Sequence, residues 1–132
     1  MHVNALDHVN IITADLDATV KFYTRLLGLD RRDAPAPLRP DQAQWMYDAQ
    51  GRAIFHINSI DMTRAFDRDV TPGPTGAIHH VALNCSDYPA AIARCAELGI
   101  GVVTNLVQSI GLKQLFITDP NEVVIELNFF ED

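Results

Sequence analysis

The chain is poor in basic residues and in cysteine. Its 10 Lys and Arg are outnumbered by 17 Asp and Glu, which gives a formal charge of −7 and a pI near 5.0. A surface of that sign disfavours nucleic acids and anionic membranes as partners. The two cysteines, Cys85 and Cys95, have no C-x-x-C spacing and no disulfide pattern. We therefore expect both to be reduced packing residues.

Segments that would direct the chain to a membrane are also missing. No run of about 18 apolar residues occurs, and no basic amino-terminal segment is followed by an apolar one. We therefore expect a soluble cytoplasmic protein. With 132 residues and 48% hydrophobic content, the chain is predicted to form a single domain over residues 1–132, with a small molecule or another protein as its partner.

One carboxylate lies in the middle of an apolar run. The stretch from Val123 to Phe129 reads V-V-I-E-L-N-F, which predicts a β-strand that carries Glu126. An ionised glutamate inside a protein is tolerated mainly when it is paired, hydrogen-bonded or bound to a metal. The stretch 53–60, A-I-F-H-I-N-S-I, aligns with this run and places His56 at the position of Glu126. This match indicates a duplicated unit.

The duplication extends over most of the chain. Residues of one type, or of one expected role, recur at a nearly constant spacing in the two halves. The matched pairs are His8 and His80, Asp15 and Asp87, Gly28 and Gly99, and His56 and Glu126, at offsets of 72, 72, 71 and 70. A spacing that drifts by only two residues is unlike chance similarity.

Each half is predicted to be a βαβββ module, which makes the fold class α+β. Module one (about residues 5–60) has expected strands at 6–13, 29–32, 44–48 and 53–60, with a helix from a cap at Asp15 to about residue 27 and a proline-rich loop at 34–40. Module two (about 77–130) has strands at 77–84, 101–106, 111–118 and 123–129, a helix at 89–98 and a turn at 119–121. Residues 61–76 form the linker, with one short helical turn around 63–66. The two tandem modules are expected to form a curved mixed sheet around a metal-binding cleft.

Four residues in equivalent places are the candidate metal ligands. If each half pairs its first strand with its last, the side chains of His8, His56, His80 and Glu126 all point into the cleft. Three imidazoles and one carboxylate suit Zn²⁺, Fe²⁺, Ni²⁺, Co²⁺ or Mn²⁺ and leave coordination positions open for a substrate.

Other residues receive lesser roles. His79 precedes His80 directly, so we expect it on the opposite face of the strand and without a catalytic role. His2 lies near a terminus and is given no role. Three aromatic residues on the strands of the first half, Trp45, Tyr47 and Phe55, are candidates for the wall of an apolar substrate pocket.

Three segments carry a resemblance to a known superfamily. D-H-V-N-I at 7–11, H-H-V-A-L at 79–83 and F-I-T-D-P-N-E-V-V-I-E-L at 116–127 resemble the vicinal oxygen chelate superfamily, which holds the glyoxalase I, methylmalonyl-CoA epimerase, fosfomycin resistance, bleomycin resistance and extradiol dioxygenase families. The resemblance implies one divalent metal held by the residues matching His8, His80 and Glu126 and chelated by two neighbouring oxygens of the substrate. His56 stands where glyoxalase I enzymes typically have Glu and the epimerases have Gln. Proton transfer is therefore expected of Glu126, with His56 as a fourth ligand or a second base.

Three functions remain open at this point. A glyoxalase-type lyase or isomerase is the first choice, because four protein ligands leave two positions for a chelating substrate. If His56 is not a ligand, a ring-cleaving extradiol dioxygenase that uses Fe²⁺ has equal standing. A non-catalytic drug-binding protein of the bleomycin resistance type is disfavoured, because such proteins lack the metal ligands. A homodimer is expected, with the site either within one chain or across two.

Overall fold

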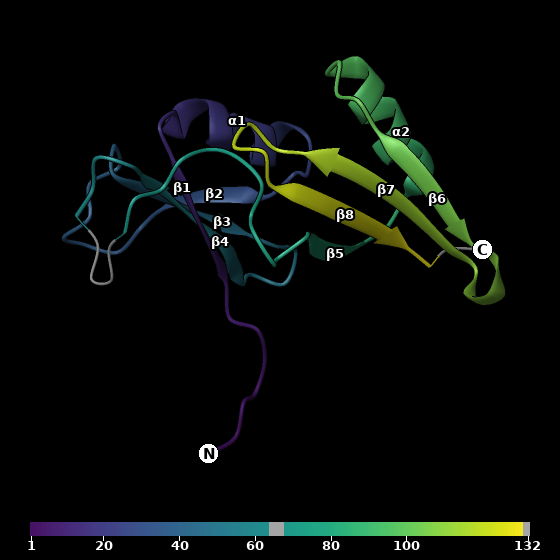
Figure 1. Cartoon of the computed structure of the whole chain (residues 1–132), viewed down its shortest axis with the longest axis horizontal. Coiled ribbons are helices and arrows are strands. Elements are labelled where there is room, and N and C mark those ends of the chain that lie inside the picture. The colour runs from purple at the N-terminus through teal and green to yellow at the C-terminus, as the bar shows by residue number, and fades with distance from the viewer. Residues whose placement is uncertain (64–67, 131–132) are drawn as a thin grey trace. The chain divides into compact units, whose positions relative to one another are not determined.

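Two compact units make up the chain. The computed structural model describes residues 1–63 and 68–130, and its units are Met1–Thr71 and Pro72–Asp132. In the part of the chain that the structure describes, each unit holds a four-stranded mixed sheet and one α-helix, which are labelled in Figure 1. Within the described ranges, no helix is long and apolar enough to cross a membrane.

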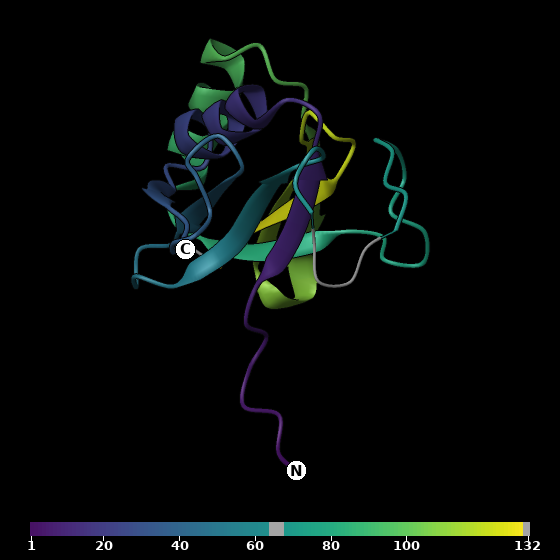
Figure 2. The ribbon, with the colours of Figure 1, turned by 90° about the vertical axis from the view of Figure 1, so that its left-hand side faces the viewer.

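The first unit is a βαβββ module. Its elements are β1 (Val9–Thr13), α1 (Leu16–Arg25), β2 (Asp30–Asp33), β3 (Ala43–Tyr47) and β4 (Ala53–Ser59). The strand order is β1-β4-β3-β2, with β1 parallel to β4 and the other pairs antiparallel. The Asp15 carboxylate caps α1, as predicted, by accepting a hydrogen bond of 3.0 Å from the Ala18 N–H. The segment before β1 leads away from the sheet (Figures 1 and 2).

The core of the first unit lies between α1 and one face of the sheet. Side chains alternate along β4, so Phe55 and Ile57 share the face toward α1, whereas His56 lies on the other face. Phe55 is 1% exposed, and its ring centroid lies 4.8 Å from that of Tyr23 on α1. The expectation that Phe55 lines a substrate pocket is therefore wrong: the side chain belongs to the core.

The second unit repeats this arrangement. Its elements are β5 (Val81–Cys85), α2 (Tyr88–Glu97), β6 (Val103–Val107), a short 3₁₀ helix η1 (Gln108–Ile110), β7 (Leu112–Thr118) and β8 (Val124–Phe129). The strand order is β5-β8-β7-β6, again with the first strand parallel to the last. Asp87 caps α2 through a 3.1 Å hydrogen bond from the Ala90 N–H. The turn before β8 is held by the Asp119 carboxylate, which accepts from the N–H groups of Asn121 and Val123, both at 2.8 Å.

Apolar side chains of β7 and β8 form the core of the second unit beneath α2. Five residues are at most 2% exposed, namely Leu115, Ile117, Ile125, Leu127 and Phe129. Tyr88 of α2 contacts Phe129 edge to face, with ring centroids 5.4 Å apart. Both cysteines are free, as predicted, and burial raises the pKa of each thiol.

The α+β class, the two βαβββ modules and the pairing of first strand with last are confirmed. Two strand starts were predicted too early, because His8 and His80 immediately precede β1 and β5 instead of lying within them. The 3₁₀ helix between β6 and β7 was not predicted. The helical turn expected around residues 63–66 lies, apart from Thr63, outside the described residues.

Replacing Phe55 with alanine is expected to lower the free energy of unfolding by about 3–5 kcal/mol, because a buried ring is removed and a cavity remains. Trp45→Ala, on the opposite face and only half-buried, is the control and is expected to cost less. Urea unfolding followed by circular dichroism measures both. Equal losses in the two variants would contradict the placement of Phe55 in the core.

Candidate functional site

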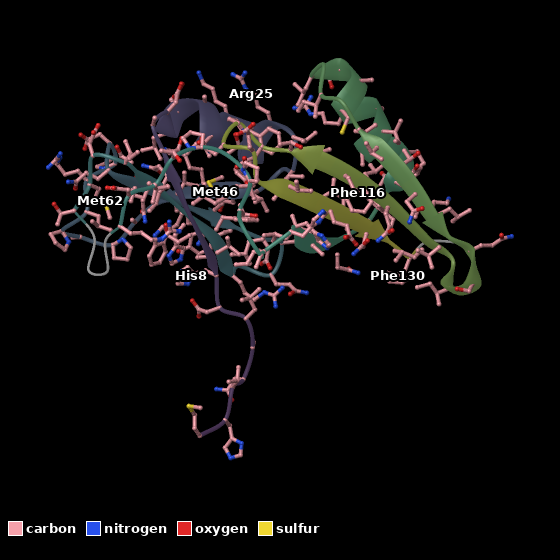
Figure 3. All side chains as sticks on the ribbon, in the orientation of Figure 1. His8, Arg25, Met46, Met62, Phe116 and Phe130 are labelled. Atoms are coloured by element: carbon pink, nitrogen blue, oxygen red, sulfur yellow. The ribbon has the colours of Figure 1, made fainter. Side chains whose placement is uncertain are left out.

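Three stacked rings occupy the face of the first sheet that is turned away from α1. Trp45 of β3 and His56 of β4 are register partners, and their parallel rings lie 3.8 Å apart between centroids. The ring of His8 stacks on the other side of His56 at 3.7 Å. Figure 3 labels His8 where the chain enters β1. His8 Nδ1 is 2.5 Å from a carboxylate oxygen of Asp7. The structure thus brings His8 and His56 together in one cluster.

His56 is uncharged at neutral pH. Burial of the imidazole, together with repulsion from His8, lowers the pKa of His56 from 6.5 to about 4, although Asp7 acts in the opposite direction. A neutral imidazole has a free nitrogen lone pair, which is the form that binds a metal or accepts a proton.

Glu126 lies on the corresponding face of the second sheet and is 7% exposed. Its Oε2 is 2.8 Å from Nε2 of His80, so the structure brings these two predicted ligands together. Its Oε1 accepts a hydrogen bond of 2.5 Å from Nε2 of Gln114 on β7. Both carboxylate oxygens therefore have partners, as burial of a charged group requires.

Gln114 is a site residue that the sequence reasoning missed. Its amide also donates to Oδ1 of Asn128 at 3.0 Å and accepts from Nδ2 of Asn105 at 2.7 Å. These side chains form a polar row across β6, β7 and β8 that ends at Glu126. The sequence feature that points to Gln114 is the alternation of side chains along β7. It places Gln114 on the same face as Phe116, the register partner of Glu126.

Phe116 is the counterpart of Trp45. Trp45 lies opposite His56 in the first sheet, and Phe116 lies opposite Glu126 in the second. The Phe116 ring, labelled on β7 in Figure 3, meets the His80 ring edge to face with centroids 6.3 Å apart. In both units an aromatic ring thus borders the predicted ligands.

The orientation expected for His79 is wrong. Its Nδ1 lies 2.9 Å from Nδ1 of His80, and the two rings meet edge to face. Alternation across a strand does not govern this pair, because both residues precede β5. His79 is therefore a neighbour of a predicted ligand and not a residue of the outer face.

The four predicted ligands have side chains whose chemistry suits a metal, two in each unit. Three imidazole nitrogens and one carboxylate oxygen are ligands that divalent transition metals and Zn²⁺ accept. Among residues 1–63 and 68–130, no group of three or more His, Cys, Asp or Glu side chains is placed to hold a metal ion. Each unit taken alone supplies two of the four donors.

Tyr47 and Trp45 lie on the same face of the first sheet. This is the face turned away from α1, which we call the open face; the open face of the second sheet is the one that carries Glu126. The Arg32 guanidinium lies over the Tyr47 ring, 4.2 Å from its centroid, in a cation–π contact that fixes the ring. Trp45 and Tyr47 thus present partly exposed aromatic surface, and Trp45 stacks on His56. This surface can contact an apolar part of a small molecule.

A separate groove of about 650 Å³ runs along α1 near β2 and β3. Its Lys21 is paired with Asp17 at 2.8 Å, and Arg31 donates to Gln44 at 2.9 Å. These charged and polar groups already have partners within the protein, so we assign the groove no ligand.

Comparison with known proteins agrees with this architecture. The sequence profile of the Glyoxalase/Bleomycin resistance protein/Dioxygenase superfamily matches residues 5–127. A protein of Arabidopsis thaliana named Glyoxylase I 4 is 25% identical over 130 residues, which span 96% of this chain and 71% of that protein.

Solved structures share the fold. A putative glyoxalase family protein from Bacillus anthracis has a TM-score of 0.75 at 16% identity, over 99% of this chain and 98% of that one. A lactoylglutathione lyase from Agrobacterium tumefaciens has a TM-score of 0.66 at 19% identity, over 96% and 94%. With two βαβββ modules and a profile match over nearly its whole length, the chain belongs to the Glyoxalase/Bleomycin resistance protein/Dioxygenase superfamily.

In the metal-free protein, His56 is expected to take up its proton with a pKa of about 4. Trp45 is the single tryptophan of the chain and stacks on His56, so its fluorescence should fall as the imidazole becomes charged. Because the pKa is lower in the folded than in the unfolded protein, the unfolded chain binds more protons between these two values. Stability is therefore lost as the pH falls from about 6.5 to 4 and is unaffected by His56 above that range.

The control for this titration is His56→Gln, which removes the group without adding a charge. A fluorescence titration, together with NMR shifts of the imidazole ring protons, measures the transition. A transition near pH 6.5 that disappears in His56→Gln would contradict the burial of His56.

Proposed function

We propose that the protein is a metal-dependent lyase or isomerase of the glyoxalase type, with His8, His56, His80 and Glu126 as metal ligands. The observation that carries the proposal is the contact between His80 and the buried carboxylate of Glu126. The first unit has His8 against His56 at the equivalent places. Family membership and the relatives named glyoxylase and lactoylglutathione lyase support this class of reaction.

The residues of this chain have distinct tasks in such a reaction. A bound divalent metal would polarise two neighbouring oxygens of the substrate and so acidify the adjacent C–H group. Glu126 takes that proton and returns it to the neighbouring carbon, a role that suits a carboxylate shielded from water. His56 serves as the fourth ligand or as a second base. Trp45 and Tyr47 hold the apolar part of the substrate.

A second candidate function follows from the stacking of His56. Its ring is held between Trp45 and His8 by stacking contacts, which can position it as an acid or base instead of a ligand. His8, His80 and Glu126 would then form a two-histidine, one-carboxylate set, which is typical of non-haem Fe²⁺ oxygenases. The substrate in that case would be a catechol and the reaction ring cleavage.

Protein purified without an affinity tag or chelator is expected to carry close to one divalent metal per chain, measured by plasma mass spectrometry. His8→Ala, His80→Ala and Glu126→Ala should each lose the metal, because each removes a donor. His2→Ala is the matched control, since it removes an exposed histidine near the terminus. The ligand set would be contradicted if His2→Ala lost the metal while the three ligand variants retained it.

Activity tests separate the two candidate reactions. Turnover of hemithioacetals of α-ketoaldehydes is expected in the metal-loaded protein and should fall about 10²–10⁴-fold in Glu126→Gln, which retains the shape but not the base. Loss of metal in His56→Ala agrees with the four-ligand site. If His56→Ala keeps iron and the wild type consumes oxygen with catechols, the lyase or isomerase proposal is wrong and the dioxygenase is right.

We also propose a homodimer, which is tested by size-exclusion chromatography coupled to light scattering. A mass near twice 14.6 kDa is expected. A mass of one chain at all concentrations would contradict it.

A further inference from the structure

We propose that Gln114 is a positioning residue that fixes one oxygen of Glu126 and leaves the other for the metal and the substrate proton. This inference rests on the proposed function and names a residue outside the predicted ligand set. Gln114 is 9% exposed and donates to Oε1 of Glu126 at 2.5 Å. Hydrogen bonds to an ionised acceptor are shorter and stronger than those between neutral groups. Oε2, on the other side of the carboxylate, faces His80.

The direction of the hydrogen bonds is determined by the carboxylate. An ionised Glu126 can only accept, so the amide nitrogen of Gln114, and not its oxygen, must face it. The amide oxygen of Gln114 then faces Asn105, which donates from Nδ2 at 2.7 Å. The second amide hydrogen of Gln114 is directed to Oδ1 of Asn128 at 3.0 Å. Three partners therefore hold the Gln114 amide in one orientation.

The first unit provides an internal comparison. By register, Gln114 lies opposite Asn128, and the equivalent residue opposite Asn58 is Ala43. The same comparison matches Glu126 with His56. The amide donor is thus present in the unit that has the carboxylate and absent in the unit that has the imidazole. A neutral imidazole does not require a charge-stabilising donor, so the difference agrees with a role directed at the carboxylate.

The hydrogen bond from Gln114 makes the two oxygens of Glu126 unequal as metal ligands. A carboxylate whose Oε1 is occupied by a strong donor is restrained in rotation and offers Oε2 as its free oxygen. Hydrogen bonds of this kind to ligating groups typically change metal affinity 10–100-fold. Gln114 acts on the reaction through Glu126 and does not touch the substrate.

The test compares Gln114→Met with Gln44→Met. Gln44 is the matched control: it is a buried glutamine, 3% exposed, that lies on the third strand of its own unit and bonds to Arg31. Methionine retains similar length and volume in both variants but removes the amide. Co²⁺ titrations followed by visible absorption, with folding checked by circular dichroism, give the affinity and the ligand-field spectrum.

Gln114→Met is expected to weaken Co²⁺ binding about 10–100-fold and to alter the spectrum, whereas Gln44→Met lowers stability and leaves both unchanged. Asn105→Ser, on the exposed strand β6, should show a smaller loss in the same direction without disturbing the fold. Wild-type affinity and spectrum in both Gln114→Met and Asn105→Ser would overturn the inference. An equal loss of affinity in Gln44→Met would also overturn it, because the effect would then be one of stability.

Failure of the proposed function is recognised separately. If the wild type binds no Co²⁺, the metal site itself is wrong, and the role of Gln114 toward a metal is wrong with it. If the wild type binds Co²⁺ and Gln114→Met binds it equally well, the function stands and only the role of Gln114 is lost. NMR of the metal-free protein gives a third readout: the Gln114 side-chain N–H resonance should lie far downfield and return to ordinary values in Glu126→Gln.

Discussion

The buried carboxylate of Glu126 is the constraint on which the open face of the second sheet depends. A charged group that is 7% exposed requires partners, and the fold supplies them from the neighbouring strand β7 and from the residue before β5. His80 meets one oxygen and Gln114 the other. Because β8 lies between β5 and β7, a residue on β8 is placed to reach both sides. The central position of the last strand therefore makes this arrangement possible.

The two units show how one backbone plan supports two different sets of side chains. Each pairs its first strand in parallel with its last and covers one face with a helix. On the open face the first unit has rings, with His56 between Trp45 and His8, whereas the second has a polar row that ends at Glu126. The first set favours a neutral imidazole, and the second supplies hydrogen-bonding partners to a buried carboxylate. Both are suitable metal donors.

Much of the fold could be predicted from the sequence because its signals are local. Helix caps at Asp15 and Asp87 and the turn at Asp119 depend on a few adjacent residues. The duplicated spacing of His8 with His80 indicated a repeated module, whereas the pairing of first and last strands was a condition under which the four candidate ligands share one face. The exact first residues of β1 and β5 could not be predicted from the sequence, because backbone pairing and not residue type decides where a strand begins.

The two wrong predictions, for Phe55 and His79, and the omission of Gln114 also have physical causes. Phe55 was assigned to a pocket by residue type, although alternation next to His56 places it on the opposite face. His79 lies before the strand, where alternation does not apply. Gln114 was missed because its contact with Glu126 is diagonal across β7 and β8, a relation that depends on register. Long-range register follows from turns and packing, so alternation along β7 indicates the face on which Gln114 lies, whereas its contact with Glu126 is defined only in the folded chain.

The proposed role of Glu126 and His80 as ligands of one divalent metal can be tested directly. The most direct measurement is anomalous diffraction from crystals of the protein loaded with Mn²⁺ or Co²⁺, collected on either side of the metal absorption edge. We expect an anomalous peak within bonding distance of Glu126 Oε2 and a ring nitrogen of His80, with His8 and His56 completing the ligand set. A peak that is bonded to neither Glu126 nor His80, or no peak in fully loaded crystals, would contradict it.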